Sequence, residues 1–241
     1  MRTVRSLLFL VALAATVVGY GTVILGAARF ASAQRLHRIA RHWSHTVLAL
    51  LRAICGLSYR LRGQDNLLGG PYVLVCKHQS AWETIALPGI LPLEQSWVLK
   101  RELMRIPFYG WALKALNPIA INRATARTAM KQLLTEGAKS LAEGRSVLIF
   151  PEGTRVPVGE RRAFSIGGAM LAEKNHVPLV PIAHNSGVFW ARRGMMRDAG
   201  CVDIVIGNPI ATDALSAREA NRLAEDWINA QVDALPAAVG P

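Results

Sequence analysis

The chain has 241 residues, of which 51% are hydrophobic and 18% are charged. This length predicts one domain with an appendage, and the composition excludes a largely disordered chain. Most of the net charge of +12 lies in residues 1–64, which contain nine Arg and no acidic residue. Basic residues beside an apolar stretch favour an anionic membrane surface and argue against nucleic acid, whose binding domains carry their positive charge on the folded body.

An apolar segment opens the chain. Residues 7–28 are uncharged, and a helix of this length, at about 1.5 Å per residue, crosses the ~30 Å hydrocarbon layer of a membrane. Gly19-Tyr20-Gly21 predicts a weak point near its middle, which would suit a bent or shallow insertion. A cleaved signal peptide is an alternative, because Ala31-Ser32-Ala33 imitates a cleavage site after the apolar run.

A second helix is expected directly after this run, because apolar residues recur at helical spacing from Leu36 to Ile54 while basic residues occupy other faces. Two interpretations stay open: an amphipathic helix in the membrane interface, or a helix packed onto the domain with a solvated basic face. We assign residues 1–62 to a membrane anchor with an amphipathic helix, and residues 63–241 to the globular domain.

The globular domain alternates short apolar runs with helical stretches, which predicts an α/β fold with a central, largely parallel sheet flanked by helices. The expected strands are Tyr72–Cys76, Trp97–Leu99, Ile119–Ile121, Ser146–Phe150, Leu179–Ala183 and Val202–Ile206. The clearest helices are Ala124–Glu143, Gly167–Lys174 and Ser216–Leu235. Ligands of such sheets gather outside the carboxyl ends of the strands, where two polar motifs of this chain lie.

The first motif follows the first of these strands and contains His78 and Glu83. If Ser80 caps the next helix, Glu83 falls in the first turn and its carboxylate can reach back to the imidazole. An imidazole oriented by a carboxylate is a general base for an attacking alcohol. The alternative is structural, because Ser80-Ala81-Trp82-Glu83 is also a capping box in which Glu83 bonds only the Ser80 amide.

The second motif, Phe150-Pro151-Glu152-Gly153-Thr154-Arg155, combines a tight turn with an Arg that can bind a phosphate through two parallel hydrogen bonds. A surface turn with an ion-paired Arg is the structural alternative. With His-x4-acid some seventy residues earlier, the pair of motifs resembles the glycerolipid acyltransferases of the lysophosphatidate type. The resemblance covers roughly residues 70–190.

The resemblance implies His78 as general base, Glu83 as the acid that orients it, and a substrate site made of Arg123, Glu152, Gly153, Thr154 and Arg155. It implies transfer of a fatty acyl group from acyl-CoA or acyl-carrier protein to the sn-2 hydroxyl of 1-acyl-sn-glycerol-3-phosphate, giving phosphatidic acid in phospholipid biosynthesis. No metal and no cofactor are expected, and residues 63–241 become the acyltransferase domain.

The chain departs from the family pattern at two places. Glu83 stands where the family usually has Asp, and Ser165-Ile166 follows Phe164 where the family commonly carries a Lys. Arg161 and Arg162 lie just upstream, where they either restore the missing positive charge or form a solvated basic loop.

Three other functions stay open: acylation of another lysolipid such as a lyso-aminolipid, a non-catalytic membrane lipid-binding protein, and an exported hydrolase. The three cysteines, Cys55, Cys76 and Cys201, have no paired spacing, which favours a reducing compartment. We expect a bacterial-type inner membrane location, membrane lipids and a lysophospholipid acceptor as partners, no nucleic acid, and a catalytic domain on the cytoplasmic side.

Overall fold

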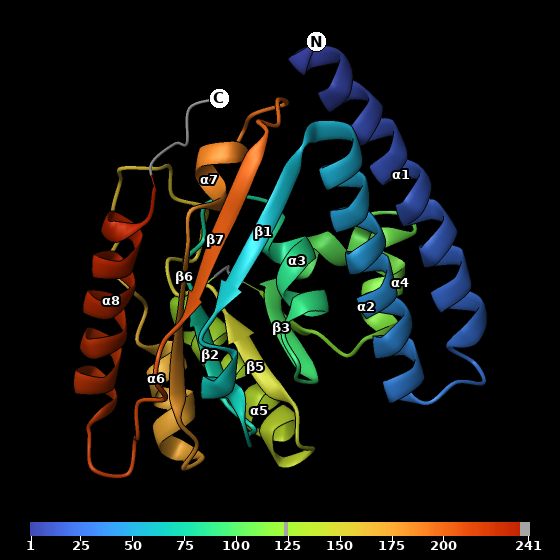
Figure 1. The fold of residues 1–241 in the computed structure, drawn as a ribbon. Helices are drawn as coiled ribbons and strands as arrows, with labels where there is room; N and C mark the ends of the chain where they lie inside the picture. The colour runs from blue at the N-terminus through green and yellow to red at the C-terminus, as the bar shows by residue number, and fades with distance from the viewer. Residues whose placement is uncertain (123–124, 237–241) are drawn as a thin grey trace.

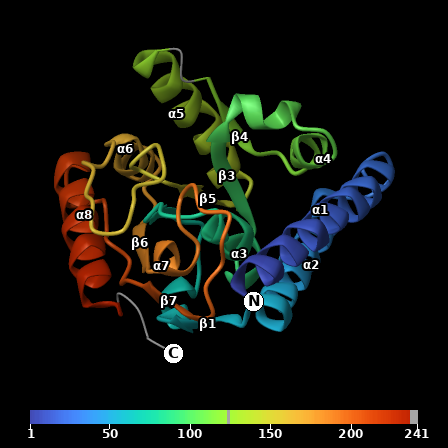
Figure 2. The same ribbon diagram turned by 90° about the horizontal axis from the view of Figure 1, so that it is seen from above.

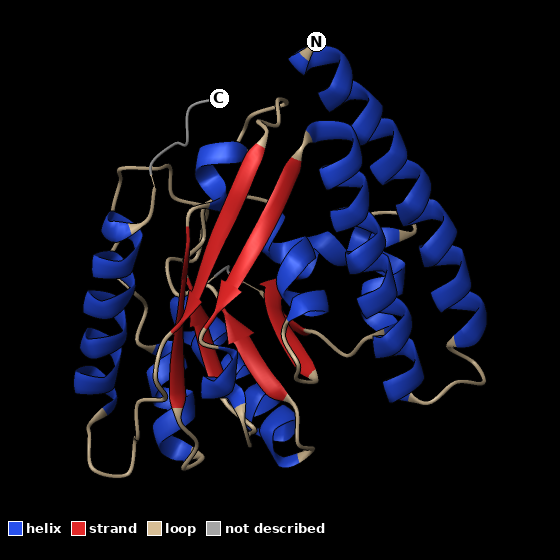
Figure 3. Ribbon diagram, viewed as in Figure 1, coloured by secondary structure: helices blue, strands red, loops and turns tan. Residues whose placement is uncertain are grey.

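The computed structural model describes residues 1–122 and 125–236 of the chain. Within these residues seven strands form one sheet in the order β1-β7-β6-β2-β5-β3-β4. Figure 3 shows the sheet, in red, with helices on its two sides. The strands are β1 (Leu57–Arg62), β2 (Val73–Cys76), β3 (Gln95–Lys100), β4 (Ile119–Ile121), β5 (Ser146–Ile149), β6 (Leu179–His184) and β7 (Gly200–Ile206).

All strand pairs of this sheet are parallel except β6 with β7. The prediction of a largely parallel sheet in an α/β fold is therefore confirmed. Strand β2 lies between β5 and β6 and runs parallel to both. The carboxyl ends of β2, β5, β6, β3 and β4 consequently meet at one edge of the sheet, which is where ligands bind in folds of this class.

Helices cover both faces of the sheet (Figures 1 and 2). Helix α3 packs on one face, with α2 and α1 outside it, and α5, α6 and α8 cover the other face. Their bounds are α1 (Arg2–Ala27), α2 (Ala33–Leu50), α3 (Trp82–Ile90), α5 (Ala126–Ala142), α6 (Gly167–Lys174) and α8 (Ala217–Ala234). Shorter elements are α4 (Tyr109–Ala115), α7 (Ser186–Phe189), the 3₁₀ turns Gln64–Leu67 and Arg101–Arg105, and a π-helical turn at Leu51–Cys55.

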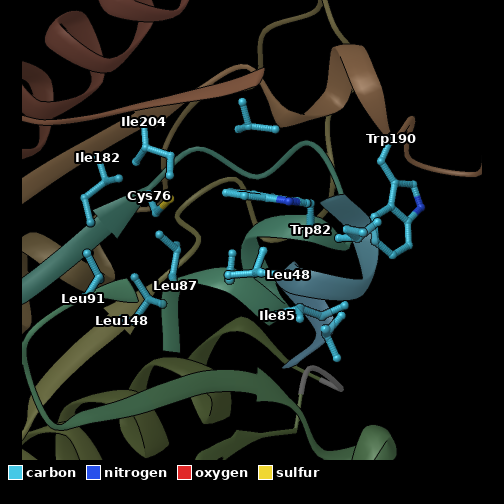
Figure 4. Packing of buried hydrophobic residues seen from close by; sticks show 14 of the residues in the cluster. Leu48, Cys76, Trp82, Ile85, Leu87, Leu91, Leu148, Ile182, Trp190 and Ile204 are labelled. Carbon is cyan, nitrogen blue, oxygen red and sulfur yellow. The ribbon is translucent and has the colours of Figure 1, made fainter. Parts of the chain in front are cut away.

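The sheet is buried on both sides, and successive side chains of a strand enter different cores. Leu74 and Cys76 of β2 pack with the α2–α3 side, whereas Val73 and Val75 pack with the α5–α6–α8 side. Figure 4 shows the first core, with Trp82 of α3 among apolar side chains of the sheet and of α2. Burial of each such apolar side chain contributes roughly 1.5–3 kcal/mol to the stability of the fold. This packing holds β2 and α3, between which the first motif lies, in fixed positions.

The N-terminal helix is continuous from Arg2 to Ala27, so the weak point expected at Gly19-Tyr20-Gly21 does not interrupt it. Gly21 instead permits close packing, because a Cβ there would lie 3.1 Å from Cβ of Phe108, just before α4. Phe9 is fully buried in the core and packs edge-on against Trp190. Helix α1 is thus part of the folded structure.

Helix α2 packs on the domain. Its apolar side buries Leu36, Val47 and Leu48, and Arg41 donates hydrogen bonds to the carbonyl oxygens of Gly89 (3.0 Å) and Leu91 at the end of α3. Those carbonyls lie at the helix end, where an intrahelical partner is missing. Packing on the domain was one of the two sequence interpretations of this helix.

In the described residues one helix, α1, is long and apolar enough to cross a membrane. Only a small part of it is buried, and its exposed side chains include Val4, Leu8, Val11 and Val23. Water disfavours a contiguous exposed surface of this kind. The exposed face of α1 therefore supports association of the protein with a membrane.

Strand β1 was not expected from the sequence, which grouped residues 57–62 with the N-terminal segment. It pairs in parallel with β7 at the edge of the sheet. Arg60 and Arg62 of this strand both contact the nearly buried carboxylate of Asp203 in β7. The basic residues that looked like a continuation of the membrane-proximal segment thus hold an edge strand in place.

Candidate active site

The loops after β2, β5 and β6 meet at the shared edge of the sheet, and each contributes to one polar cluster. His78 follows β2, Glu152 follows β5, and Ser186 follows β6. The backbone N–H of His78 donates to Glu152 Oε2 at 2.7 Å, and the N–H of Val156 donates to the carbonyl of His78 at 2.7 Å. The structure therefore brings the two sequence motifs together.

His78 and Glu83 form a hydrogen-bonded pair, with Nδ1 of the imidazole 2.9 Å from Oε1 of the carboxylate. Helix α3 begins at Trp82, and Ala81 precedes it as N-cap in place of the expected Ser80. The ring of His78 stacks on Phe150, with centroids 4.2 Å apart. Since an ionised carboxylate only accepts hydrogen bonds, Nδ1 carries the proton, and Nε2 is left as the basic nitrogen.

The Glu83 carboxylate is completely buried and is held by four donors. Oε1 accepts hydrogen bonds from His78 and from the N–H groups of Gln79 and Ser80, and Oε2 accepts one from Ser186 Oγ at 2.8 Å. Burial alone raises the pKa of Glu83, but its interactions with His184, His78 and the Ser80 amide outweigh burial and lower that pKa to about 2. Glu83 thus bonds the Ser80 amide and orients the imidazole at the same time.

A second, fully buried histidine supports this pair from β6. His184 Nε2 donates to the carbonyl of Lys77 at 2.7 Å, and its Nδ1 accepts from the Ser186 N–H at 3.3 Å. One donating and one accepting nitrogen describe a neutral imidazole. Burial lowers the pKa of His184, which favours that neutral form. Neither His184 nor Ser186 was predicted from the sequence as a site residue.

Glu152 is buried beneath the site. One oxygen pairs with Nζ of Lys77, which is also buried, and the other accepts from the His78 N–H. Burial raises the pKa of Glu152, and the ion pair with Lys77 and the amide of His78 act against this rise. The Glu152 carboxylate therefore fixes the backbone that carries His78. Although Glu152 was predicted as a residue of the substrate site, it does not line the cavity described below.

The turn after β5 presents the remaining residues of the second motif. Gly153 has φ +71°, a conformation that favours glycine, and its N–H is hydrogen-bonded to the carbonyl of Phe150. A Cβ at this position would meet nothing within 4 Å. Gly153, Thr154 and Arg155 all line the same cavity as His78.

This cavity has a volume of about 670 Å³ and is mainly apolar. Its walls come from α1, α2, α3, β3 and α4, with side chains such as Val17, Trp43, Ile85 and Leu113. Long apolar chains fit such a chamber, since concave apolar pockets of this size bury most of a ligand's surface. A basic imidazole thus lies in the wall of a chamber that suits acyl chains.

Four cationic side chains also line the cavity: Lys100, Arg155, Arg192 and Arg193. Arg192 donates from Nη2 to Thr154 Oγ1 at 3.2 Å. Among the described residues, none of these four cations forms an ion pair with a carboxylate. Uncompensated positive charge beside a reactive group is a site for an anion.

Arg123, which the sequence analysis assigned to the substrate site, lies outside the described residues. Arg161 pairs with Asp233 on the surface, and neither Arg161 nor Arg162 lines the cavity. The two arginines found in their place, Arg192 and Arg193, lie in a segment without a recognisable motif. Among the described residues no group of His, Cys, Asp and Glu is arranged to hold a metal ion.

Similar proteins of known family identify the family of this chain. The sequence profile described as Acyltransferase matches residues 58–185, which include His78, Glu83 and the 150–155 turn. A 1-acyl-sn-glycerol-3-phosphate acyltransferase of Pseudomonas aeruginosa is 40% identical over 95% of this chain and 90% of its own length. The chain belongs to the acyltransferase family.

More distant members of the acyltransferase family are also similar. A 1-acyl-sn-glycerol-3-phosphate acyltransferase of Saccharomyces cerevisiae is 27% identical over 77% of this chain and 62% of its own length. The crystal structure of the 1-acyl-sn-glycerophosphate acyltransferase PlsC from Thermotoga maritima matches with a TM-score of 0.80 at 22% identity and covers all of both chains. The last comparison confirms the fold, including the N-terminal helices, for this acyltransferase.

Proposed function

We propose that this acyltransferase moves a fatty acyl group from a thioester donor to the sn-2 hydroxyl of 1-acyl-sn-glycerol-3-phosphate and so makes phosphatidic acid. The observation that carries the proposal is the oriented His78–Glu83 pair, whose imidazole lines the same cavity as Arg155. The name shared by the curated relatives supports the choice of acceptor. A base, a cation and an apolar chamber are the groups that this reaction requires.

In the proposed reaction, Nε2 of His78 takes the proton from the sn-2 hydroxyl as its oxygen attacks the thioester carbonyl carbon. The carbon–sulfur bond then breaks, and the departing sulfur takes the proton from Nε2. The products are an ester and a free thiol, and His78 returns to its starting state. Glu83 holds Nδ1–H throughout and stabilises the imidazolium that forms transiently.

Glu83, Glu152 and Ser186 act on this step without touching the substrate in our proposal. Glu83 fixes the ring and tautomer of His78, Ser186 fixes Glu83, and Glu152 fixes the backbone at His78. Gly153, Thr154 and Arg155 contribute to the substrate site, because they line the cavity. No cofactor enters this mechanism.

We further propose that the acyl donor is acyl-CoA or acyl-carrier protein and that the domain faces the cytoplasm of a bacterial-type inner membrane. Helix α1 supports the association with a membrane, because its exposed apolar face suits a membrane while its buried face forms a wall of the cavity. Cleavage after Ala33 would remove that wall and Phe9 from the core. A mature protein that begins near Met1 is therefore expected, which mass measurement of the purified chain checks.

The function is tested by following thiol release from acyl-CoA with the purified full chain in mixed micelles. We expect release to depend on added 1-acyl-sn-glycerol-3-phosphate and phosphatidic acid to form in equal amount. Preference for a lyso-aminolipid would assign the second candidate acceptor. Equal release without any acceptor would identify a hydrolase, and ligand binding without thiol release would identify a lipid-binding protein; either result contradicts the proposal.

A further inference from the structure

The headgroup site of this chain lacks the Lys that the family commonly carries after Phe164, where Ser165 and Ile166 stand. The upstream arginines do not replace that charge, because Arg161 pairs with Asp233 of α8 and neither it nor Arg162 lines the cavity. The positive charge at the cavity instead comes from Lys100, Arg155, Arg192 and Arg193, which all line it.

The segment after α7 provides such charge. Arg192 and Arg193 both line the cavity that contains His78, and Arg192 donates a hydrogen bond to the Thr154 hydroxyl, next to Arg155. That bond places the guanidinium beside the turn of the second motif. Thr154 accepts it through its oxygen, which leaves the hydroxyl proton available to an acceptor in the cavity.

The charge balance of this region favours an anion. Among the ion pairs of the described residues, none includes Arg155, Arg192 or Arg193. Arg155 and Arg192 are half-buried and Arg193 is exposed. Like charges that lie close together repel each other, and a bound dianion removes that repulsion while accepting several charge-assisted hydrogen bonds. Arginine is well suited to this task because its planar fork matches the oxygens of a phosphate.

The chain path connects these arginines with the catalytic pair. The same segment begins at Ser186, whose hydroxyl bonds Glu83 Oε2 at 2.8 Å, and continues through α7 to Arg192. In a glycerol 3-phosphate the phosphate is separated from the sn-2 hydroxyl by only a few covalent bonds, whereas the phosphates of CoA lie at the far end of a long pantetheine arm. A phosphate site adjoining the turn beside His78 therefore fits the acceptor better than the donor.

We propose that Arg192 and Arg193 bind the phosphate of the lysolipid acceptor, together with Arg155. This inference rests on the proposed function, because it names residues that recognise the acceptor's headgroup. The chemical class is a phosphate monoester dianion on a glycerol backbone. The assignment makes Arg192 and Arg193 specificity residues, which select phosphate-bearing over neutral acceptors.

The test compares R192Q, R193Q and the double variant with the unchanged protein in mixed micelles. Each assay measures KM for 1-acyl-sn-glycerol-3-phosphate, KM for acyl-CoA, and turnover of a monoacylglycerol, which lacks phosphate. Each single variant is expected to raise KM for the phosphate acceptor about tenfold, the size of one lost hydrogen bond to a charged group. KM for acyl-CoA and turnover of monoacylglycerol should stay within about twofold.

R161Q is the matched control. Arg161 was considered from the sequence as a source of the missing charge, but it pairs with Asp233 and does not line the cavity. It should leave all three quantities unchanged, and circular dichroism should show the same fold for every variant. A KM increase confined to acyl-CoA would place the arginines on the donor and overturn the inference, as would unchanged kinetics of the double variant. A loss of the same size for both acceptors would also overturn it.

These outcomes are distinct from failure of the proposed function, which is read from the unchanged protein alone. If that protein prefers monoacylglycerol or releases thiol without acceptor, the function itself is wrong. If it prefers the phosphate acceptor and the arginine variants retain that preference, the function stands and the assignment of Arg192 and Arg193 fails.

Discussion

The hydroxyl of Ser186 lies 2.8 Å from Oε2 of Glu83, and this contact ties the segment after β6 to the acid of the catalytic pair. The other oxygen of Glu83 is 2.9 Å from His78 Nδ1. The Glu83 carboxylate thus links Ser186, in the loop after β6, to the base His78, in the loop after β2. Because Glu83 is one methylene longer than the Asp usual in this family, a donor on its far oxygen restricts the extra torsion.

Ser186→Ala removes that donor and should lower kcat roughly tenfold, as expected for one hydrogen bond to a charged group. Both KM values should stay within about twofold, because Ser186 does not line the cavity. Ser186→Thr, which retains a hydroxyl, should recover most of the lost rate. Ser140→Ala is the matched control, since the hydroxyl of this buried serine donates to the Glu136 carbonyl within α5, away from the site. A KM effect without a kcat effect would contradict a positioning role.

Glu83 should make the stability of the fold sensitive to acid. Its pKa is lowered from the model-peptide value of 4.5 to about 2, so folding favours the ionised form. The stabilisation is complete above pH 4.5 and is lost as the pH falls through about 2. Denaturant unfolding at pH 5 and near pH 2 should show that Glu83→Gln lacks this part of the acid sensitivity. An exposed-site control, Glu160→Gln, should behave like the unchanged protein, and identical pH dependence in both variants would contradict the claim.

Alanine variants of two glycines distinguish the cost of backbone strain from an effect on substrate binding. Gly153 and Gly144 both have positive φ, +71° and +80°, and a Cβ on either would meet nothing within 4 Å. Alanine at either position should therefore cost about 1–2 kcal/mol through its left-handed conformation alone. Gly153→Ala should also raise KM for the lysolipid, because Gly153 lines the cavity, whereas Gly144→Ala, after α5, should not. Thermal unfolding and acceptor titration measure the two effects, and equal KM values for both variants would contradict the assigned place of Gly153.

Much of the fold was predictable because its strands are buried on both faces and therefore appear as continuous apolar runs. The expected Ile119–Ile121 and Gly167–Lys174 have the same bounds in the structure. The other predicted strands differ by one or two residues at one end, or at both ends for β3. Strand β1 escaped prediction because its burial comes from one edge contact with β7 while Arg60 stays largely exposed. An edge strand with half-exposed basic residues has the composition of a solvated segment.

The site was partly predictable for a different reason. His78, Glu83 and the 150–155 turn belong to local motifs whose spacing is recorded in the sequence, whereas Ser186 and Arg192 reach the site through tertiary contacts. Glu152 shows how far a motif can predict a role. Its motif marks it as a substrate-site residue, but in the structure it is buried against Lys77, beneath the site. Only the pairing of β2 with β5 and β6 reveals which side chains face the cavity and which lie beneath it.

The most direct test of the central claim is acceptor-dependent thiol release by His78→Ala, measured against the unchanged protein at equal concentration. Loss of the general base should lower the rate by at least about a hundredfold, with binding of 1-acyl-sn-glycerol-3-phosphate and the thermal unfolding midpoint nearly unchanged. Release within tenfold of the unchanged protein, from a folded variant, would contradict the assignment of His78 as the base.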